Sequence, residues 1–262
     1  MFSKLKAKRL AIAAAAVLAA GHTAVHAEGN TIEAGLLHHD LGSTYGNWNQ
    51  QFLRGIFLLN SKNVLNADLV HFDQFGATGT LYALGLTHTF NDLWYGSASA
   101  SGSSGGFFLP QSRYDIVANR KLGAASNVIA TLGFTAIDSK DGHSDRSLLL
   151  AMTYYAPYAL ILEGGTRLNR SNPGAVRTNN YYVAGTWGHN KDQYISLRLG
   201  TGEEGYQVIS ADALLVNFRS RVATATWRKW VNQTQGFQVR AEAYHNPFYN
   251  RRGVEVSVFQ EF

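Results

Sequence analysis

The sequence predicts an all-β fold: a transmembrane antiparallel up-and-down β-barrel of about 14 strands, with roughly 12 to 16 as the range, after a cleaved signal peptide. Three observations support this fold. The chain begins with a leader-like segment, it ends on a strand with a two-residue period, and the residues between form short alternating segments without a long apolar run. We therefore expect a signal peptide at residues 1–27 and one outer-membrane β-barrel domain at residues 28–262.

The first 27 residues have the three parts of a secretory signal peptide. Four basic residues between positions 4 and 9 precede an apolar run at residues 11–20, and residues 25–27 offer a small-residue cleavage site. A membrane-spanning helix needs about 20 apolar residues, so the alternative of an N-terminal anchor is disfavoured. Because the chain contains no cysteine, we expect neither a lipid-modified cysteine nor disulfide bonds.

The leader also carries much of the positive charge. The whole chain has 23 basic and 18 acidic residues, and four of the basic residues but none of the acidic ones lie in residues 1–27. The remaining 19 basic and 18 acidic residues nearly balance, so the high isoelectric point comes mostly from the leader. No basic stripe with interleaved aromatic residues is present, and we expect no nucleic-acid partner.

Fourteen segments of the remaining chain are predicted to be strands. Most run for roughly ten residues, the length that a tilted strand needs to cross a bilayer. Turn-forming residues interrupt them, and all four prolines fall in the interruptions, as strand pairing requires. The expected strands begin near Thr31, Trp48, Val64, Thr80, Leu93, Ser112, Asn127, Asp145, Tyr158, Arg177, Gln193, Arg219, Gly236 and Gly253.

The interruptions alternate between short and long, with residues 76–79 as an exception. In outer-membrane barrels short turns face the periplasm and longer loops face the exterior. An even number of strands then places both chain ends in the periplasm. The longer expected loops are residues 41–47, 101–111, 139–144, 171–176, 201–218 and 246–252.

Alternation within the strands separates an apolar face from a polar one. Phe237, Val239 and Ala241, for example, alternate with Gln238 and Arg240. A soluble β-sandwich also alternates in this way, so the tryptophans decide between the two folds. They fall near the periplasmic ends of expected strands, where an interfacial aromatic girdle belongs. The predicted girdle residues are Trp94, Trp187, Trp227 and Trp230.

The C-terminal strand, residues 253–262, resembles the closing strand of bacterial outer-membrane proteins. Val254, Val256 and Val258 alternate with residues that are mostly polar, and Phe262 is the terminal aromatic residue. In those proteins the barrel-assembly machinery recognises the terminal Phe, so the resemblance implies that Phe262 is the assembly signal. It also implies the outer membrane of a Gram-negative bacterium, with membrane lipid and lipopolysaccharide around the barrel.

Three further stretches carry a resemblance to a known family. Residues 107–116, 194–206 and 220–227, together with the single barrel and its order of elements, resemble the YaiO-type outer-membrane β-barrel family. Some members resemble the barrel parts of polysaccharide exporters, so the resemblance implies envelope polysaccharide handling as a role and saccharides as partners. It implies no catalytic residue, and we expect no cofactor.

The inward-facing positions of the expected strands carry both signs of charge, with arginine the commonest. Arginine binds carboxylate or phosphate through two parallel hydrogen bonds, so one interpretation is a narrow polar passage for anionic or sugar-like solutes. The other is a network of cross-strand ion pairs that braces and plugs the lumen, which near-balanced charge favours. The predicted lumen-lining residues are Glu33, Arg54, Asn66, Asp68, Arg113, Asp115, Glu163, Arg167, Arg198, Arg228, Arg240, Glu242 and Glu255.

A hydrolase with an active site at the outer rim is the main alternative from another class. The residue types of a Ser-His-Asp site occur together twice, but Ser and Asp are ordinary turn formers, so we expect no enzyme. Adjacent strand residues point to opposite faces, so we expect no metal site either. The residues concerned are Asp141, His143, Ser144 and Asp145 in an outer loop, and His38, His39 and Asp40 at the end of the first strand.

A plugged structural or adhesive barrel that acts through its loops is the third alternative. The longest expected loop, residues 201–218, has an acidic tip, and residues 101–108 are glycine-rich and end on two aromatics. Either loop could gate the mouth or stack against a carbohydrate. The sequence therefore predicts an integral outer-membrane barrel that is a narrow pore or part of envelope polysaccharide handling, with these alternatives open.

Overall fold

A computed structural model describes residues 29–42, 46–140, 142–210 and 213–262. The expected signal peptide at residues 1–27 lies outside these residues. Within them, no helix is long and apolar enough to cross a membrane. The strands are β1 (Thr31–Asp40), β2 (Asn47–Asn60), β3 (Asn63–Gln74), β4 (Ala77–Thr89), β5 (Trp94–Gly105), β6 (Pro110–Leu122), β7 (Val128–Ser139), β8 (Ser144–Ala156), β9 (Leu160–Asn172), β10 (Val176–His189), β11 (Gln193–Ser210), β12 (Ala213–Trp230), β13 (Gln235–His245) and β14 (Asn250–Glu261).

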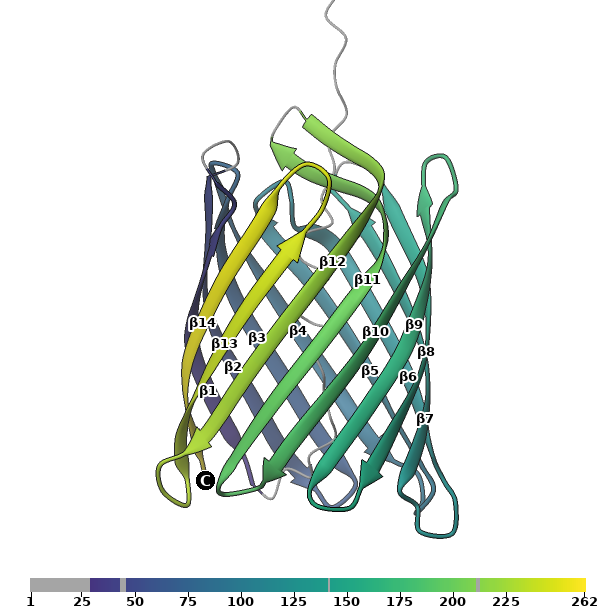
Figure 1. Ribbon diagram of the computed structural model, residues 1–262, viewed down its shortest axis with the longest axis vertical. Coiled ribbons are helices and arrows are strands. Elements are labelled where there is room, and N and C mark those ends of the chain that lie inside the picture. The colour runs from purple at the N-terminus through teal and green to yellow at the C-terminus, as the bar shows by residue number, and fades with distance from the viewer. Residues whose placement is uncertain (1–28, 43–45, 141, 211–212) are drawn as a thin grey trace, which may run out of the picture.

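The fourteen strands form one closed antiparallel barrel in chain order, which confirms the predicted fold class. β1 pairs with β14 from Thr31 opposite Glu261 to Asp40 opposite Arg252. Backbone hydrogen bonds between Asn30 and Phe262 extend this seam to the last residue. Closure leaves no unpaired sheet edge, which a bilayer requires because it offers no water to free backbone groups. Figure 1 shows the tilted strands as a single ring, with the C-terminus at its lower end.

Thirteen of the fourteen expected strand starts lie within three residues of the observed ones. The exception is β12, which is expected near Arg219 and begins at Ala213. The predicted loop at residues 201–218 is therefore wrong, because most of these residues continue the β11–β12 ladder, for example with Tyr206 opposite Val216. Pairing satisfies backbone groups that a loop would leave to water. In Figure 1 this hairpin rises above the upper rim and bends.

The other connections are also short, and the predicted contrast between the two ends of the barrel is wrong. The expected loop at residues 101–111 is reduced to residues 106–109, and the expected loop at residues 171–176 to residues 173–175. Connections at the other end, at residues 90–93 and 123–127, are at least as long as these two. The end that carries Phe262 is called the periplasmic end below, because an exported chain with an even strand count begins and ends there.

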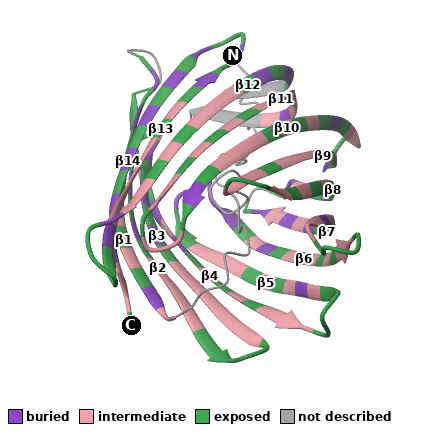
Figure 2. Cartoon of the chain, turned by 60° about the horizontal axis from the view of Figure 1, so that its bottom comes forward, coloured by how far each residue is buried: buried purple, intermediate pink, exposed green. Residues whose placement is uncertain are grey.

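The two faces of the wall differ in polarity. On β14, Val254, Val256 and Val258 are exposed on the outside, whereas Glu255 and Ser257 are buried on the inside. Figure 2 shows this alternation as bands of colour along most strands. An apolar belt of this extent is unusual for a protein surface in water but matches the hydrocarbon core of a bilayer. The wall therefore turns an apolar surface outward and keeps its polar side chains inside.

Three of the predicted girdle tryptophans lie on the outer face at the periplasmic end. Trp94 begins β5, and Trp187 and Trp227 lie close to the ends of β10 and β12, all three exposed. The prediction for Trp230 is wrong, because this side chain is only 6% exposed and packs inside against Phe259. Trp230 follows Trp227 by three residues, and an odd separation along a strand changes the face.

Apolar side chains also pack inside the barrel, at the end opposite the chain termini. Two buried clusters lie there, and Phe75 packs against both of them. We call these residues together the mouth cluster. Its members are Phe52, Val70, Phe72, Leu81, Phe108 and Leu109 in one group, Leu41, Trp48, Phe218, Tyr244 and Tyr249 in the other, and Phe75 between them.

Candidate functional site

Each lumen-lining residue predicted from the sequence lies at an inward-facing position of its strand. Strand pairing places some of them side by side. Glu33 on β1 is directly opposite Arg54 on β2, and Arg54 is directly opposite Asp68 on β3. Asn66 precedes Asp68 by two residues and so shares its face. The two-residue period thus brings charges of opposite sign together on the inner wall.

The most buried of these charges is Glu255 on β14, with 1% of the residue exposed. Its carboxylate lies 3.1 Å from Arg240 Nη2 and 3.7 Å from Arg54 Nη1. Arg54 Nε lies a further 3.4 Å from Asp68 Oδ1. Four charged groups from β2, β3, β13 and β14 therefore form one chain of alternating sign across the barrel seam.

Two further pairs lie nearer the periplasmic end. Arg228 Nη1 donates to Glu33 Oε2 at 3.0 Å. Arg198 Nη1 donates to Glu163 Oε1 at 3.3 Å, and its guanidinium lies 3.6 Å above the centre of the Tyr182 ring. A ring face attracts a cation, so Tyr182 helps to hold Arg198 in place.

A second polar network spans β6 to β9. Asp115 accepts hydrogen bonds from Arg113 Nε at 2.7 Å and Nη2 at 2.8 Å, and a third from the Thr135 hydroxyl at 2.7 Å. Arg167 Nη1 donates to Thr135 Oγ1 at 3.1 Å and to Ser147 Oγ at 2.9 Å. Arg167 is thus linked to the Asp115 carboxylate only through a hydroxyl.

Sequence reasoning missed part of a third group near the outer rim. Arg251 Nη2 donates to Glu242 Oε1 at 2.7 Å, and His39 Nε2 lies 3.3 Å from the same oxygen. A Cβ at Gly253 would collide with the His39 ring, so glycine is needed for the ring to lie against the wall. Arg251 lies four positions before Glu255, so the two-residue period would have placed both on the inner face. The sequence analysis missed Arg251 because it assigned residues 246–252 to a loop.

The mouth cluster lies inside the rim above these pairs. Phe107, in the β5–β6 connection, packs beside Phe75 with 6.4 Å between ring centres, and both rings remain partly exposed. Lys140, in the β7–β8 connection, donates to the carbonyl groups of Gly105 and Gly106 and so links the two connections. Partial burial of the Lys140 ammonium lowers its pKa, because the charged form loses water there.

The predicted hydrolytic residues do not converge on one face of the wall. His143 and Asp145 are buried inside, whereas Ser144 between them lies at an outward-facing position. The hydroxyl that reaches Asp145 is instead that of Ser171. Asp141 lies outside the described residues.

The pair His38 and His39 splits in the same way. His38 Nδ1 lies 2.8 Å from Asn49 Oδ1 on the exposed face, while His39 packs inside. No group of three or more His, Cys, Asp or Glu side chains within the described ranges is placed to hold a metal ion.

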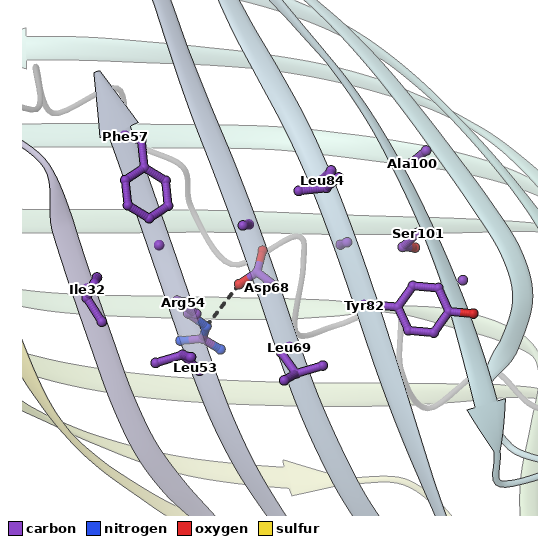
Figure 3. Close-up of a pocket in the computed structure, with 14 residues that line it drawn as sticks. Ile32, Leu53, Arg54, Phe57, Asp68, Leu69, Tyr82, Leu84, Ala100 and Ser101 are labelled. Carbon is purple, nitrogen blue, oxygen red and sulfur yellow. Dashed lines mark ion pairs between the residues drawn. The ribbon is translucent and has the colours of Figure 1, made fainter. Parts of the chain in front are cut away.

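A cavity of about 610 Å³ lies against β1–β5. Leu53, Leu69, Tyr82 and Leu84 line it, and all four are exposed on the outer face. Figure 3 shows these side chains around the same strands that carry the Arg54–Asp68 pair. The cavity therefore belongs mainly to the outer surface of the wall rather than to the lumen.

At the family level, residues 29–207 match the YaiO membrane beta barrel domain. The matched segment covers more than half of the chain and runs from β1 into β11. No curated protein sequence matches the chain.

Several solved structures share the fold at low sequence identity. A bacterial polysaccharide outer membrane secretin has a TM-score of 0.61 at 10% identity, with 90% of this chain and 99% of that chain covered. The CymD monoaromatic hydrocarbon channel has a TM-score of 0.59 at 7% identity, with 90% and 89% covered. An anion-selective porin from Comamonas acidovorans has a TM-score of 0.52 at 8% identity, with 89% and 98% covered. These similarities show an outer-membrane barrel fold of the kind found in porins and channels.

Proposed function

This chain belongs to the YaiO membrane β-barrel family, and from that premise we propose that it forms a narrow outer-membrane passage for hydroxyl-rich solutes. Chains of envelope sugars are the solute class that its inner wall suits best. The protein is an integral outer-membrane barrel, and the proposal concerns what its lumen accepts. Barrels of 16–18 strands leave an aqueous channel while those of about eight are filled by side chains, so about fourteen strands suit a narrow passage.

The paired charges of the inner wall are the observation that carries this proposal. A mobile ion in such a lumen meets both signs at once and gains little from either. A sugar hydroxyl can donate to a carboxylate and accept from a guanidinium at the same pair, and a sugar chain repeats this at every ring. The carboxylates that lie against an arginine are Glu33, Asp68, Asp115, Glu163, Glu242 and Glu255.

The mouth cluster supports the same solute class. The C–H faces of sugar rings are apolar and stack on aromatic side chains, whose rings combine large area with few rotatable bonds. Phe75 of this cluster and the neighbouring Phe107 are partly exposed rings that lie beside each other at the rim. A chain that enters would therefore meet aromatic rings first and paired charges below them. The fold shared with a polysaccharide outer membrane secretin agrees with this class.

A plugged structural barrel is the second candidate function. The specific observation in its favour is the burial of Glu255 and Arg251, since ion pairs that deep can brace a closed lumen. The two functions differ in whether water and solute cross the barrel.

Conductance separates them. The refolded protein is inserted into planar bilayers, and single-channel currents are recorded with and without maltohexaose on one side. A passage for sugar chains predicts small discrete current steps that the neutral oligosaccharide interrupts. Bilayers that stay silent, together with liposomes that do not swell in small sugars, would contradict the passage and favour the plugged barrel.

We further propose that membrane lipid and lipopolysaccharide surround the barrel, and that the assembly machinery recognises β14 through Phe262. Support comes from the exposed side chain of Phe262 at the periplasmic end of the β1–β14 seam. Deletion of Phe262 should lower the fraction of heat-modifiable, membrane-inserted protein in cells. Unchanged insertion would contradict the role of Phe262.

A further inference from the structure

One inward-facing arginine differs from the others. Within the described strands seven arginines point into the lumen, and all but Arg167 lie within ion-pair distance of a carboxylate. The six paired ones are Arg54, Arg113, Arg198, Arg228, Arg240 and Arg251.

Hydroxyl groups hold the Arg167 side chain in place. It reaches from β9 across β8 towards β7, where Nη1 donates to Ser147 and Thr135. Hydroxyls position the guanidinium without neutralising it. Its Nε and Nη2 atoms have no hydrogen-bond partner among the described residues, and neither atom is fully buried. A planar guanidinium with two free donors can bind an oxyanion through two hydrogen bonds.

The nearby carboxylates already have other partners. Asp115 accepts three hydrogen bonds from Arg113 and Thr135. Asp145, two residues before Ser147 on β8, accepts from Asn169 and Ser171. Neither carboxylate forms an ion pair with Arg167.

The nearest cations add to the positive charge at this place. Arg113 and Arg198 are both close enough to repel Arg167 electrostatically, while Asp115 attracts it. Asp115 is paired with Arg113 and Glu163 with Arg198, so neither carboxylate is paired with Arg167. An anion between these groups would relieve the repulsion.

We infer that Arg167, fixed by Thr135 and Ser147 and flanked by Arg113 and Arg198, is an oxyanion-binding site on the inner wall. The ligand is a carboxylate or phosphate group, either free in the lumen or carried on a sugar. The site lies beyond the proposed passage function and does not depend on it, because an anion could occupy it in an open or a plugged barrel.

Binding can be measured without any conductance. A ligand that binds only the folded barrel raises its unfolding temperature in a saturable way. The full protein in detergent is heated in sodium chloride of fixed ionic strength, with chloride replaced stepwise by inorganic phosphate or by galacturonate, and unfolding is followed by tryptophan fluorescence. Galactose, which lacks the carboxylate, is the neutral probe.

Three variants give the comparison. Arg167→Gln removes the charge, and Arg167→Lys keeps the charge but loses the planar pair of donors. Arg146→Gln is the control, because it removes an arginine from the outer face of β8 beside Ser147. Charge-assisted hydrogen bonds predict that Arg167→Gln weakens the apparent affinity roughly tenfold or more, that Arg167→Lys lies between, and that Arg146→Gln matches the natural chain.

The outcomes distinguish the sources. Stabilisation by phosphate alone identifies a phosphate group as the ligand, and stabilisation by galacturonate alone identifies the carboxylate of an acidic sugar. Equal stabilisation of Arg167→Gln and the natural chain would overturn the site, as would the lack of any effect of either anion on the natural chain. Block of conductance by maltohexaose is a separate result, so the passage and the site can fail independently.

Discussion

Replacing Glu255 with glutamine is the perturbation for which the structure gives the clearest magnitude. Glutamine keeps the shape of the side chain but removes its charge. Arg240, whose side chain is 12% exposed, then loses the carboxylate that lies 3.1 Å away, its single ion-pair partner among the described residues. Arg54 loses a weaker contact at 3.7 Å but keeps Asp68 at 3.4 Å.

The expected loss of unfolding free energy is about 3 kcal/mol. Breaking a buried ion pair by neutralising one partner costs roughly 3–5 kcal/mol, mostly because the other charge stays buried without compensation. The low end of this range applies here, because only Arg240 loses its partner and the Arg54 side chain is 24% exposed to solvent in the lumen.

The assay is urea unfolding of the barrel in lipid vesicles, followed by tryptophan fluorescence. Glu203→Gln is the matched control, because Glu203 lies 3.9 Å from Arg219 and the two side chains are 38% and 86% exposed. Such an exposed pair contributes about 0–1 kcal/mol. The double variant Glu255→Gln with Arg240→Gln should lose less than the sum of the two single changes. A loss for Glu255→Gln that is no larger than that of the control would refute the account of the inner-wall pairs.

Three further predictions test other parts of the molecule. Val256→Arg puts a charge on the outer side of β14 and should lower the unfolding free energy in vesicles by about 2–4 kcal/mol. Val231→Arg, just beyond β12 at the periplasmic end, should lower it by about 0–1 kcal/mol, and equal effects of the two changes would contradict the position of the barrel in the bilayer. Phe108→Ala removes a ring that is 1% exposed and should lower the unfolding free energy by about 3–5 kcal/mol, and a change below about 1 kcal/mol would show that the mouth cluster is not packed. His143→Ala should leave fatty-acid and peptide release at the same background level as the natural chain, and activity that this change abolishes would establish a hydrolase.

The sequence predicted the fold well because a barrel repeats one simple rule. Each strand alternates between lipid and lumen, so counting in twos from Phe262 places Glu255 inside and Val256 outside. The same counting places Glu33, Arg54 and Asp68 on the inner face. It fails where the face is misjudged, as for Trp230, which was grouped with Trp227 although it lies an odd number of positions, three, further along the strand.

Other features depend on contacts that no local pattern encodes. The predicted loop at residues 201–218 is rich in turn-like residues, yet pairing between two distant strands keeps most of it in the ladder. The mouth cluster forms because closure brings β1 beside β14, which places Trp48 close to Tyr249. Among the inward-facing arginines of the described strands, Arg167 alone has no carboxylate partner. This difference can be recognised only when the partners of the other six arginines are known.

The alternation along β14 is the most direct test of the central claim. The chain has no cysteine, so single cysteines at positions 254 to 258 can carry a fluorescent label in an otherwise unlabelled barrel. In vesicles that contain quencher lipids, labels at positions 254, 256 and 258 should be quenched strongly and those at 255 and 257 weakly. A quenching profile without a two-residue period, or with the opposite phase, would contradict a barrel that turns its valines to lipid and its charges inward.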